Sequence, residues 1–229
     1  MPKIKVISLA HREDRRQAFV LNNDKYLQEY EFVDAYDGKQ KSYVDLLIDG
    51  FDTDKNWRDP NLDRVLTKGE IGCFVSHFYL WEQCAQGDEE YLILEDDVQF
   101  FNPLSEILLD VPTYDLLYLT HREMMPEAAM SVGGGFVRPA YPYWLAAYII
   151  TPDAAKKLVE NHPEQNIIPA DEYVPRMLDR IDALGFEEPM VNQLSRSKLG
   201  TDIEPLYESD YVRDFKVHAL TCGSDNERM

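Results

Sequence analysis

The stretch LILEDDVQF, residues 92–100, joins a short apolar run to three consecutive carboxylates. Tyr91–Leu94 is typical of a buried strand, and it leads directly into Glu95, Asp96 and Asp97. In open α/β sheets, ligands bind outside the carboxyl ends of the strands. Adjacent carboxylates repel one another unless a cation lies between them, and Mg²⁺ and Mn²⁺ prefer such oxygen ligands. The stretch therefore indicates a metal-assisted ligand site, with a solvated acidic turn as the alternative.

The segments around this stretch alternate between strand-like and helix-like patterns. Ile4–Leu9 is apolar and β-branched, and the charged residues after it predict a helix from about Arg12 to Leu27. This alternation predicts an α/β fold with a mainly parallel central sheet flanked by helices, in one domain of residues 1–229. The C-terminal part, from about residue 190 to 229, is expected to close over the site. Further expected elements are strands at Tyr30–Ala35, Asp115–Leu119 and Leu145–Ile150, an irregular segment at Asp45–Asn61 and a helix at Pro152–Glu160.

A helix is predicted upstream of the acidic stretch, in LTKGEIGCFVSHFYLW, residues 66–81. Thr67 is the expected N-cap, and Glu70 three residues later completes a capping box. The apolar positions that follow lie on one helical face, so the helix should continue to about Gln86.

The start of this helix is a candidate ligand-binding position. Lys68 and Gly69 offer exposed backbone N–H groups and the positive end of the helix, which suit a phosphate or a sugar hydroxyl. Ser76 and His77 lie about two turns further along, on a face near that start. The alternative is a helix packed on the core, in which His77 is a buried, hydrogen-bonded side chain.

The composition describes a folded, acidic protein. The chain has 42 acidic and 23 basic residues, and its formal net charge is -19. A field of that sign weakens non-specific attraction to phosphate backbones and to anionic membrane surfaces. Nucleic-acid and lipid partners are therefore less expected, although a local basic groove is still allowed.

Apolar runs and cysteines bear on the compartment. No apolar stretch approaches the roughly 20 residues that span a bilayer, and the N-terminal region turns polar too soon for a signal-peptide core. Cys73, Cys84 and Cys222 are odd in number and lack metal-type spacing, which suits a reducing compartment. We therefore expect a soluble, cytoplasmic protein without a transmembrane segment, of open oligomeric state.

Two blocks of this sequence together resemble a known enzyme family. KGEIGCFVSH at 68–77 with LW at 80–81, followed by LILEDDVQF at 92–100, resembles glycosyltransferase family 25 in order and spacing. That family includes bacterial lipopolysaccharide-type galactosyltransferases and animal collagen galactosyltransferases. The resemblance covers roughly residues 3–205. Further similar segments are VISLAHREDRR at 6–16, VDAYDG at 33–38, AAYIITPDAAKKLV at 146–159 and PADEYV at 169–174.

The resemblance implies a GT-A type fold, a UDP-sugar donor, a divalent metal (Mn²⁺ or Mg²⁺) and inversion at the anomeric carbon. This chain departs from the family pattern at Ser8, where the opening strand usually carries Asn. The family's late Ser-Asp-Ile element corresponds here only to Thr201, Asp202 and Ile203. The strong acidity is also unlike enzymes that work beside anionic lipid, which counts against a lipopolysaccharide acceptor.

The resemblance also implies roles for the acidic stretch. Asp97 is the expected direct metal ligand, and Glu95 is expected to contact the metal or the ribose. Asp96 supports the loop or touches the donor sugar. His218 or Asp202 would complete the metal shell.

Donor contacts are expected along the first strand and the two helices. Arg12 and Arg15 follow the strand, where they could bind the diphosphate with paired donors, a solvated helix start being the alternative. The predicted donor-binding residues are Leu9, Arg12, Arg15, Lys68, Gly69, Glu70, Ser76, His77 and Asp96.

Asp171 and Glu172 are the candidates for the base that removes the acceptor proton. Pro169 precedes them, and the acidic pair could open a helix that directs a carboxylate at the cleft. An ordinary helix N-terminus is the alternative, because Asp and Glu favour that position. Asp202 and His77 are the next candidates.

The sequence thus predicts an inverting, metal-dependent glycosyltransferase that moves galactose, or a related hexose or pentose, from a UDP-sugar to an acceptor hydroxyl. The acceptor is left open among a glycan, a protein hydroxyl and a hydroxylated base in modified DNA, which could be flipped out for reaction. A function of another class is a catalytically inactive nucleotide-sugar or partner-binding module. The presence of Glu95–Asp97 and of Asp171 and Glu172 favours the enzyme.

Overall fold

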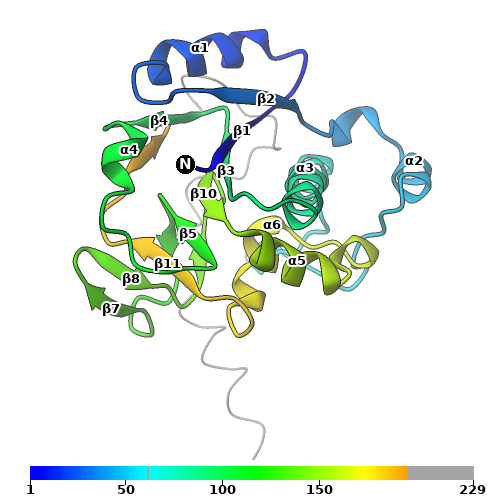
Figure 1. The fold of residues 1–229 in the computed structure, drawn as a ribbon. Helices are drawn as coiled ribbons and strands as arrows, with labels where there is room; N and C mark the ends of the chain where they lie inside the picture. The colour runs from blue at the N-terminus through cyan, green and yellow to red at the C-terminus, as the bar shows by residue number, and fades with distance from the viewer. Residues whose placement is uncertain (61, 195–229) are drawn as a thin grey trace, which may run out of the picture.

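The computed structural model describes residues 1–60 and 62–194, and an eight-stranded sheet runs through the middle of the molecule (Figure 1). Its strands, in their order across the sheet, are β2 (Tyr30–Asp34), β1 (Lys3–Ser8), β3 (Tyr91–Glu95), β10 (Ala147–Ile150), β5 (Leu116–Tyr118), β11 (Ala183–Phe186), β8 (Phe136–Arg138) and β7 (Met130–Gly133).

Six of these eight strands point in the same direction. Strand β1 is parallel to β2 and to β3, and β5 is parallel to β11. Strand β10 is antiparallel to both β3 and β5, and β8 is antiparallel to β11 and β7, so only these two are reversed. The expected mainly parallel sheet of an α/β domain is therefore confirmed, and its strands include all those that the sequence predicted.

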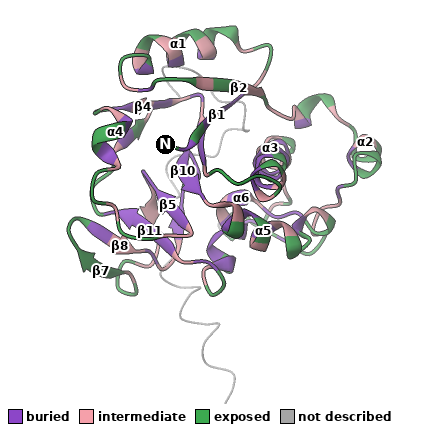
Figure 2. Ribbon diagram, in the orientation of Figure 1, coloured by how far each residue is buried: buried purple, intermediate pink, exposed green. Residues whose placement is uncertain are grey.

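Helices cover both faces of the sheet, because successive strand residues point to opposite sides. On one face, Ile93 and Tyr148 join Phe74 and Trp81 of α3 and Leu158 of α5 in one apolar cluster. The inner strands β1, β3, β10, β5 and β11 accordingly form the buried centre of the molecule, whereas the edge strands β2 and β7 have no buried residue (Figure 2). The helices on this side are α3 (Lys68–Ala85), α5 (Pro152–Glu160) and α6 (Ala170–Tyr173).

The opposite face carries a second apolar cluster. Leu92 and Ile149, the neighbours in sequence of Ile93 and Tyr148, pack there with Phe19 and Ile107. Phe19 belongs to α1 (Glu13–Asn23) and Ile107 to α4 (Leu104–Ile107). The sheet thus lies between two layers, and the loops at the carboxyl ends of its parallel strands are left to form a site.

The predicted start of α3 is confirmed. Thr67 accepts from the backbone N–H of Glu70, and the Glu70 side chain accepts in return from the N-cap backbone. Two glycines let this start approach the loop after β2. A Cβ on Gly72 would lie 2.5 Å from the Tyr36 carbonyl oxygen, and one on Gly38 would lie 2.0 Å from the Lys68 carbonyl oxygen. The two glycine-containing motifs therefore face each other.

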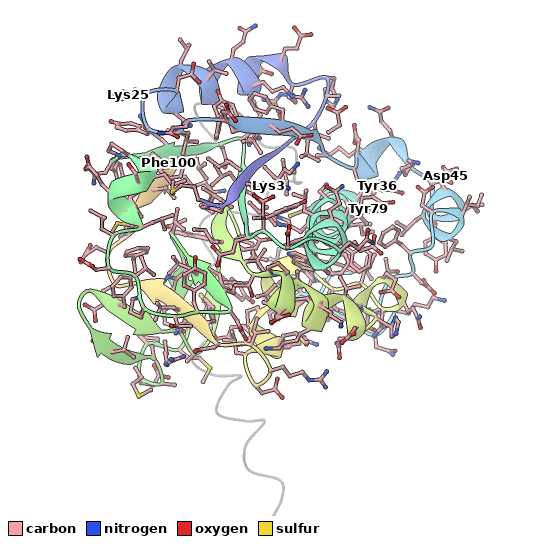
Figure 3. The ribbon with its side chains drawn as sticks, viewed as in Figure 1. Lys3, Lys25, Tyr36, Asp45, Tyr79 and Phe100 are labelled. Carbon is pink, nitrogen blue, oxygen red and sulfur yellow. The ribbon has the colours of Figure 1, made fainter. Side chains whose placement is uncertain are left out.

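The segment predicted to be irregular, Asp45–Asn61, begins inside a short helix, α2 (Tyr43–Ile48), so the prediction is wrong for its first four residues. Residues 49–60 contain no helix or strand, as expected. Ser42 and Asp45 form a second capping box, a local pattern that the sequence analysis missed. Tyr79, a residue of α3, is labelled beside Tyr36 in Figure 3, and the Tyr36 hydroxyl donates to Asp49 at the end of α2. The Phe51 ring packs against Tyr36 and Tyr79 at 6.5 and 5.6 Å.

The sequence analysis also missed several short elements. A hairpin joins β7 and β8 through Gly133, Gly134 and Gly135, all with positive φ of 83, 66 and 85°. Among the described residues, none of the helices combines the length and apolar composition that a bilayer crossing requires. The remaining elements are η1 (Gly38–Gln40), β4 (Val98–Phe100), β6 (Arg122–Glu123), β9 (Pro142–Tyr143), η2 (Pro163–Gln165), η3 (Pro175–Met177) and β12 (Val191–Gln193), of which β12 pairs with β4 and β6 with β9.

Candidate functional site

The three carboxylates end β3 and form the turn that leads into β4. Glu95 is the last residue of β3, and Asp96 and Asp97 make the turn. Their side chains are 25%, 7% and 17% exposed, respectively. The three side chains are thus mostly withdrawn from solvent, so the alternative of a solvated acidic turn is wrong. Burying charge is favourable only where partners compensate it, so this turn needs such partners.

Asp96 is held by residues from the first strand and the first helix. Its Oδ2 accepts a 2.6 Å hydrogen bond from Ser8 Oγ, and its Oδ1 lies 2.5 Å from a guanidinium nitrogen of Arg15. The same Arg15 nitrogen lies 3.1 Å from Asp97 Oδ2. Burial raises the pKa of Asp96, and the charge of Arg15 opposes this rise. The contacts of Asp96 are those of a side chain that fixes the loop.

Glu95 and Asp97 face a single amide. Gln193 Nε2 donates to Glu95 Oε2 at 3.2 Å and lies 3.3 Å from both carboxylate oxygens of Asp97. Burial, and then the charge of Glu95, raises the pKa of Asp97 to about 7, and burial raises the pKa of Glu95. Two half-buried carboxylates that disfavour each other's ionisation are a donor set that fits a hard divalent cation.

Gln193 is a site residue that the sequence analysis missed. It lies on β12, whose antiparallel pairing with β4 brings Gln193 opposite Val98. The backbone N–H of Leu194 also donates to the Asp97 carbonyl oxygen at 2.7 Å. A three-residue strand with a polar end gives no local signal of this contact.

Two side chains of α3 reach the other side of Glu95. Cys73 Sγ and His77 Nε2 lie 3.9 and 3.8 Å from Glu95 Oε1. His77 Nδ1 lies 2.9 Å from the hydroxyl of Tyr148, which also accepts from Trp81 Nε1 at 2.8 Å. Burial lowers the pKa of His77 to about 4, so the imidazole is neutral at neutral pH. Cys73 is a second residue that the sequence analysis did not assign.

The remaining predicted residues of α3 contact the protein itself. Ser76 Oγ donates to the Gly72 carbonyl oxygen at 2.7 Å and accepts from the Tyr36 N–H at 2.9 Å. Lys68 Nζ donates to the Lys41 carbonyl oxygen at 3.0 Å. Gly69, in the first turn, is half-buried.

Glu70 and the residues before α1 are also engaged. Besides the capping box, Glu70 pairs with Arg64 at 2.7 and 2.9 Å. Arg12 pairs with Asp14, and its backbone N–H donates to the Leu9 carbonyl oxygen at 2.9 Å. The structure thus brings Arg15 into contact with the acidic turn. Arg12, the N-cap of α1, pairs with Asp14, and its charge also opposes the rise that burial causes in the pKa of Asp96.

Asp171 and Glu172 open α6 but have different surroundings. Asp171 Oδ1 accepts a 2.9 Å hydrogen bond from the backbone N–H of Leu145. Burial, followed by the charge of Glu95, raises the pKa of Asp171 to about 6. The Asp171 carboxyl is therefore close enough to the acidic turn to respond to its charge. Glu172 instead accepts from the hydroxyls of Tyr141, at 2.8 Å, and Tyr143.

The site therefore unites residues from β1, α1, α3, β3, α6 and β12 around Glu95. Asp202 and His218, the candidates to complete the metal shell, lie outside the described residues. An exposed aromatic residue adjoins the site in the chain. Trp144 is 42% exposed and has a positive φ of 73°, rare for a bulky residue, and it precedes the residue that binds Asp171. Backbone strain of this kind is concentrated at functional sites.

The sequence matches one protein-family model. Residues 1–128 match the model described as glycosyltransferase family 25 (LPS biosynthesis protein). These residues contain the whole acidic turn and α3, and they make up more than half of the chain.

Curated relatives carry names from the same family. The chain is 37% identical over 186 residues to a rat protein named probable inactive glycosyltransferase 25 family member 3, covering 76% of this chain and 32% of that protein. It is 30% identical over 198 residues to human procollagen galactosyltransferase 2, covering 81% of this chain and 32% of that protein. The chain thus spans about a third of the length of the curated relatives it matches.

Among solved structures, a glycosyltransferase called GlyE from Streptococcus pneumoniae is similar at a TM-score of 0.42 and 11% identity. The match covers 81% of this chain and 45% of that one.

Proposed function

This chain belongs to glycosyltransferase family 25, and from that membership we propose that it transfers a sugar from a UDP-sugar to an acceptor hydroxyl, with inversion at the anomeric carbon. Galactose, or a related hexose or pentose, is the proposed sugar. The reaction is proposed to depend on Mn²⁺ or Mg²⁺.

The observation that carries this proposal is the pair Glu95 and Asp97 at the carboxyl end of β3. Both are half-buried, and they share one neutral amide donor, that of Gln193. They would hold the divalent metal, which stabilises the charge of the departing diphosphate when bound. Arg15, with Asp96 fixed by Ser8, holds this turn in shape.

Asp171 is the proposed base. Its carboxylate is oriented by the Leu145 N–H, and its pKa of about 6 suits a group that accepts a proton near neutral pH. Glu172 is less suited to the role, because two tyrosine hydroxyls already donate to it. We assign Glu172 to positioning α6 and the Tyr141–Tyr143 segment.

The acceptor is proposed to bind beside Trp144. Trp144 is exposed and precedes Leu145, whose N–H binds the proposed base. An exposed indole is a surface on which the apolar face of a sugar ring or another flat group can pack. A glycan or a protein hydroxyl fits this better than a hydroxylated DNA base, because the net charge of -19 repels a phosphate backbone. We propose a reducing, cytoplasmic location because Cys73 and Cys84 are free thiols.

The second candidate function is an inactive nucleotide-sugar-binding module, favoured by the name of the rat relative. UDP release from UDP-galactose and from a panel of other UDP-sugars distinguishes the two. With Mn²⁺ and no acceptor, an active enzyme slowly transfers the sugar to water and so produces UDP from the UDP-sugar. An inactive module binds UDP but produces none from the UDP-sugar. Absence of UDP release from every donor, with UDP binding retained, would overturn the enzymatic proposal.

A further inference from the structure

Three chemically different ligand groups meet on the helix side of Glu95. Cys73 Sγ, His77 Nε2 and a Glu95 carboxylate oxygen all lie within 4.8 Å of one another. Cys73 and His77 are one helical turn apart on α3, so they project from the same face, and Glu95 comes from the end of β3.

The ring nitrogen of His77 that faces this cluster is unpartnered. The His77 side chain is 1% exposed, and among the described residues Nε2 has no hydrogen-bond partner. A buried polar atom without a partner is costly, and a ligand that binds it removes that cost. The tautomer that donates from Nδ1 to the Tyr148 oxygen leaves the Nε2 lone pair directed at Cys73 and Glu95.

From this geometry we propose that Cys73, His77 and Glu95 bind a borderline divalent cation, of which Zn²⁺ is the type, at a site separate from that of Glu95 and Asp97. Thiolate and imidazole are the ligands that zinc prefers over Mg²⁺ and Mn²⁺. The thiolate and the carboxylate neutralise the ion, and His77 enters as a neutral ligand. This inference does not rest on the glycosyltransferase proposal.

The two separations from Glu95 are close to those of a zinc site, and the third, between Cys73 Sγ and His77 Nε2, is within 4.8 Å. Zinc bonds of about 2.0–2.3 Å in a tetrahedron place ligand atoms about 3.3–3.5 Å apart. The observed separations from Glu95 Oε1 are 3.8 Å to His77 and 3.9 Å to Cys73, so each needs to shorten only slightly. Three protein ligands leave the fourth position for water or another ligand.

The two oxygens of Glu95 keep the two cation sites apart. Oε1 faces Cys73 and His77, whereas Oε2 accepts from Gln193, which also faces Asp97. Glu95 would therefore be a bridging carboxylate, with the borderline ion on its helix side and the hard ion on its Asp97 side. Tyr148 would be a positioning residue that orients the imidazole through Nδ1.

Binding of Co²⁺ to the metal-free full chain tests the proposal, because a cobalt–thiolate bond gives a charge-transfer absorption in the near ultraviolet. All proteins carry Cys222→Ser, which removes the thiol outside the described residues. We expect one equivalent of Co²⁺ to produce this band, and Zn²⁺ to displace it. Cys84→Ala is the matched control, because Cys84 lies on the same helix but its thiol donates to the Glu89 and Ile150 carbonyl oxygens. This variant should keep the band.

Cys73→Ser should abolish the band and weaken Zn²⁺ binding by at least about 100-fold, and Tyr148→Phe should weaken it by about 10–100-fold. Asp97→Asn should keep the band, because Asp97 is not a ligand of this site. This result is expected whether or not Glu95 and Asp97 also bind a metal. Melting temperatures of the metal-free variants show whether each one folds, and Cys73→Ser should fold because Cys73 is only half-buried. A missing band in the parent protein, or a band retained in Cys73→Ser, overturns the proposal.

Discussion

The side-chain amide of Gln193 lies 3.3 Å from both carboxylate oxygens of Asp97. The Gln193 amide is neutral and lies between Asp97 and Glu95. A divalent ion in that place would compensate the two negative charges far more strongly. UDP should therefore stabilise the protein more with Mn²⁺ than with EDTA. With Mn²⁺, a hundredfold excess of UDP over its Kd should stabilise the fold by about 2.7 kcal/mol. Thermal shift on the wild type and Asp97→Asn measures this. An equal UDP shift in EDTA, or in Asp97→Asn with Mn²⁺, would contradict the assignment of Asp97.

The raised pKa of Asp97 predicts a pH-dependent stability difference. Its pKa is about 7 in the fold against an ordinary value of 3.8, so between these values the unfolded chain loses the proton first. Rising pH then destabilises the metal-free fold up to about pH 7, above which the effect is constant. The stability of Asp97→Asn relative to wild type should therefore grow from about pH 5 to about pH 7, by at most roughly 1.4 kcal/mol per unit. Urea unfolding in metal-free buffer measures it, and a difference that shrinks with rising pH would refute the prediction.

Arg15 should contribute strongly to stability because it neutralises the acidic turn. It lies 2.5 Å from Asp96 and 3.1 Å from Asp97, and its side chain is only 10% exposed. Removing one partner of a buried ion pair costs about 3–5 kcal/mol, so Arg15→Met should destabilise the fold by that order. Lys156→Met is the control, because its pair with Glu160 is 3.8 Å long and exposed, and such pairs contribute about 0–1 kcal/mol. Equal losses in the two variants, measured by urea unfolding, would show that Arg15 does not compensate the turn.

The parts of the fold that depend on local pattern were predictable from the sequence. The capping box of Thr67 and Glu70 gives the start of α3, and Thr151 with Pro152 gives a helix whose bounds, Pro152–Glu160, match the prediction. The run Tyr91–Leu94 is buried on both faces, so it reads as a continuous apolar strand.

The parts of the site that depend on packing between distant segments could not be predicted from the sequence. Gln193 reaches Asp97 only because β12 pairs with β4, almost 100 residues earlier in the chain. Cys73 and His77 share a helix face, but their partner Glu95 follows only from the docking of α3 against β3. The burial of His77 confirms what the sequence analysis held as its alternative, because this helix packs on the core.

The pH dependence of transfer should follow the ionisation of Asp171. A base acts in its deprotonated form, so the rate should fall as the pH falls through about 6, the pKa of Asp171 in the metal-free protein. A bound cation beside Glu95 would remove part of the negative charge that raises this pKa, and would move the inflection to lower pH. Rates measured from about pH 5 to 8 at saturating donor test this. A rate that is unchanged over the whole range would exclude Asp171 as the base.

Substitution of Asp171 and Glu172 separates the base from its structural neighbour. Asp171→Asn keeps an oxygen that can accept from the Leu145 N–H, so the fold should persist while the basicity is lost. The transfer rate should fall by ~10²–10⁴-fold, about 3–5 kcal/mol of barrier, with UDP affinity nearly unchanged. Glu172→Gln weakens the hydrogen bonds from Tyr141 and Tyr143, so it should lower stability by about 1–3 kcal/mol with a smaller effect on rate.

Transfer kinetics, UDP titration calorimetry and urea unfolding on both variants distinguish the outcomes. Loss of UDP affinity in step with rate would assign Asp171 to the donor site rather than to the acceptor. Near-normal transfer by Asp171→Asn together with a large rate loss in Glu172→Gln would exchange the two roles, and the two hydroxyls on Glu172 would then have to release it during the reaction. Near-normal transfer by both would move the base to Asp202 or His77. Of these, His77 is buried and neutral with Nε2 facing Glu95, so it would need the acceptor to approach from the side of α3.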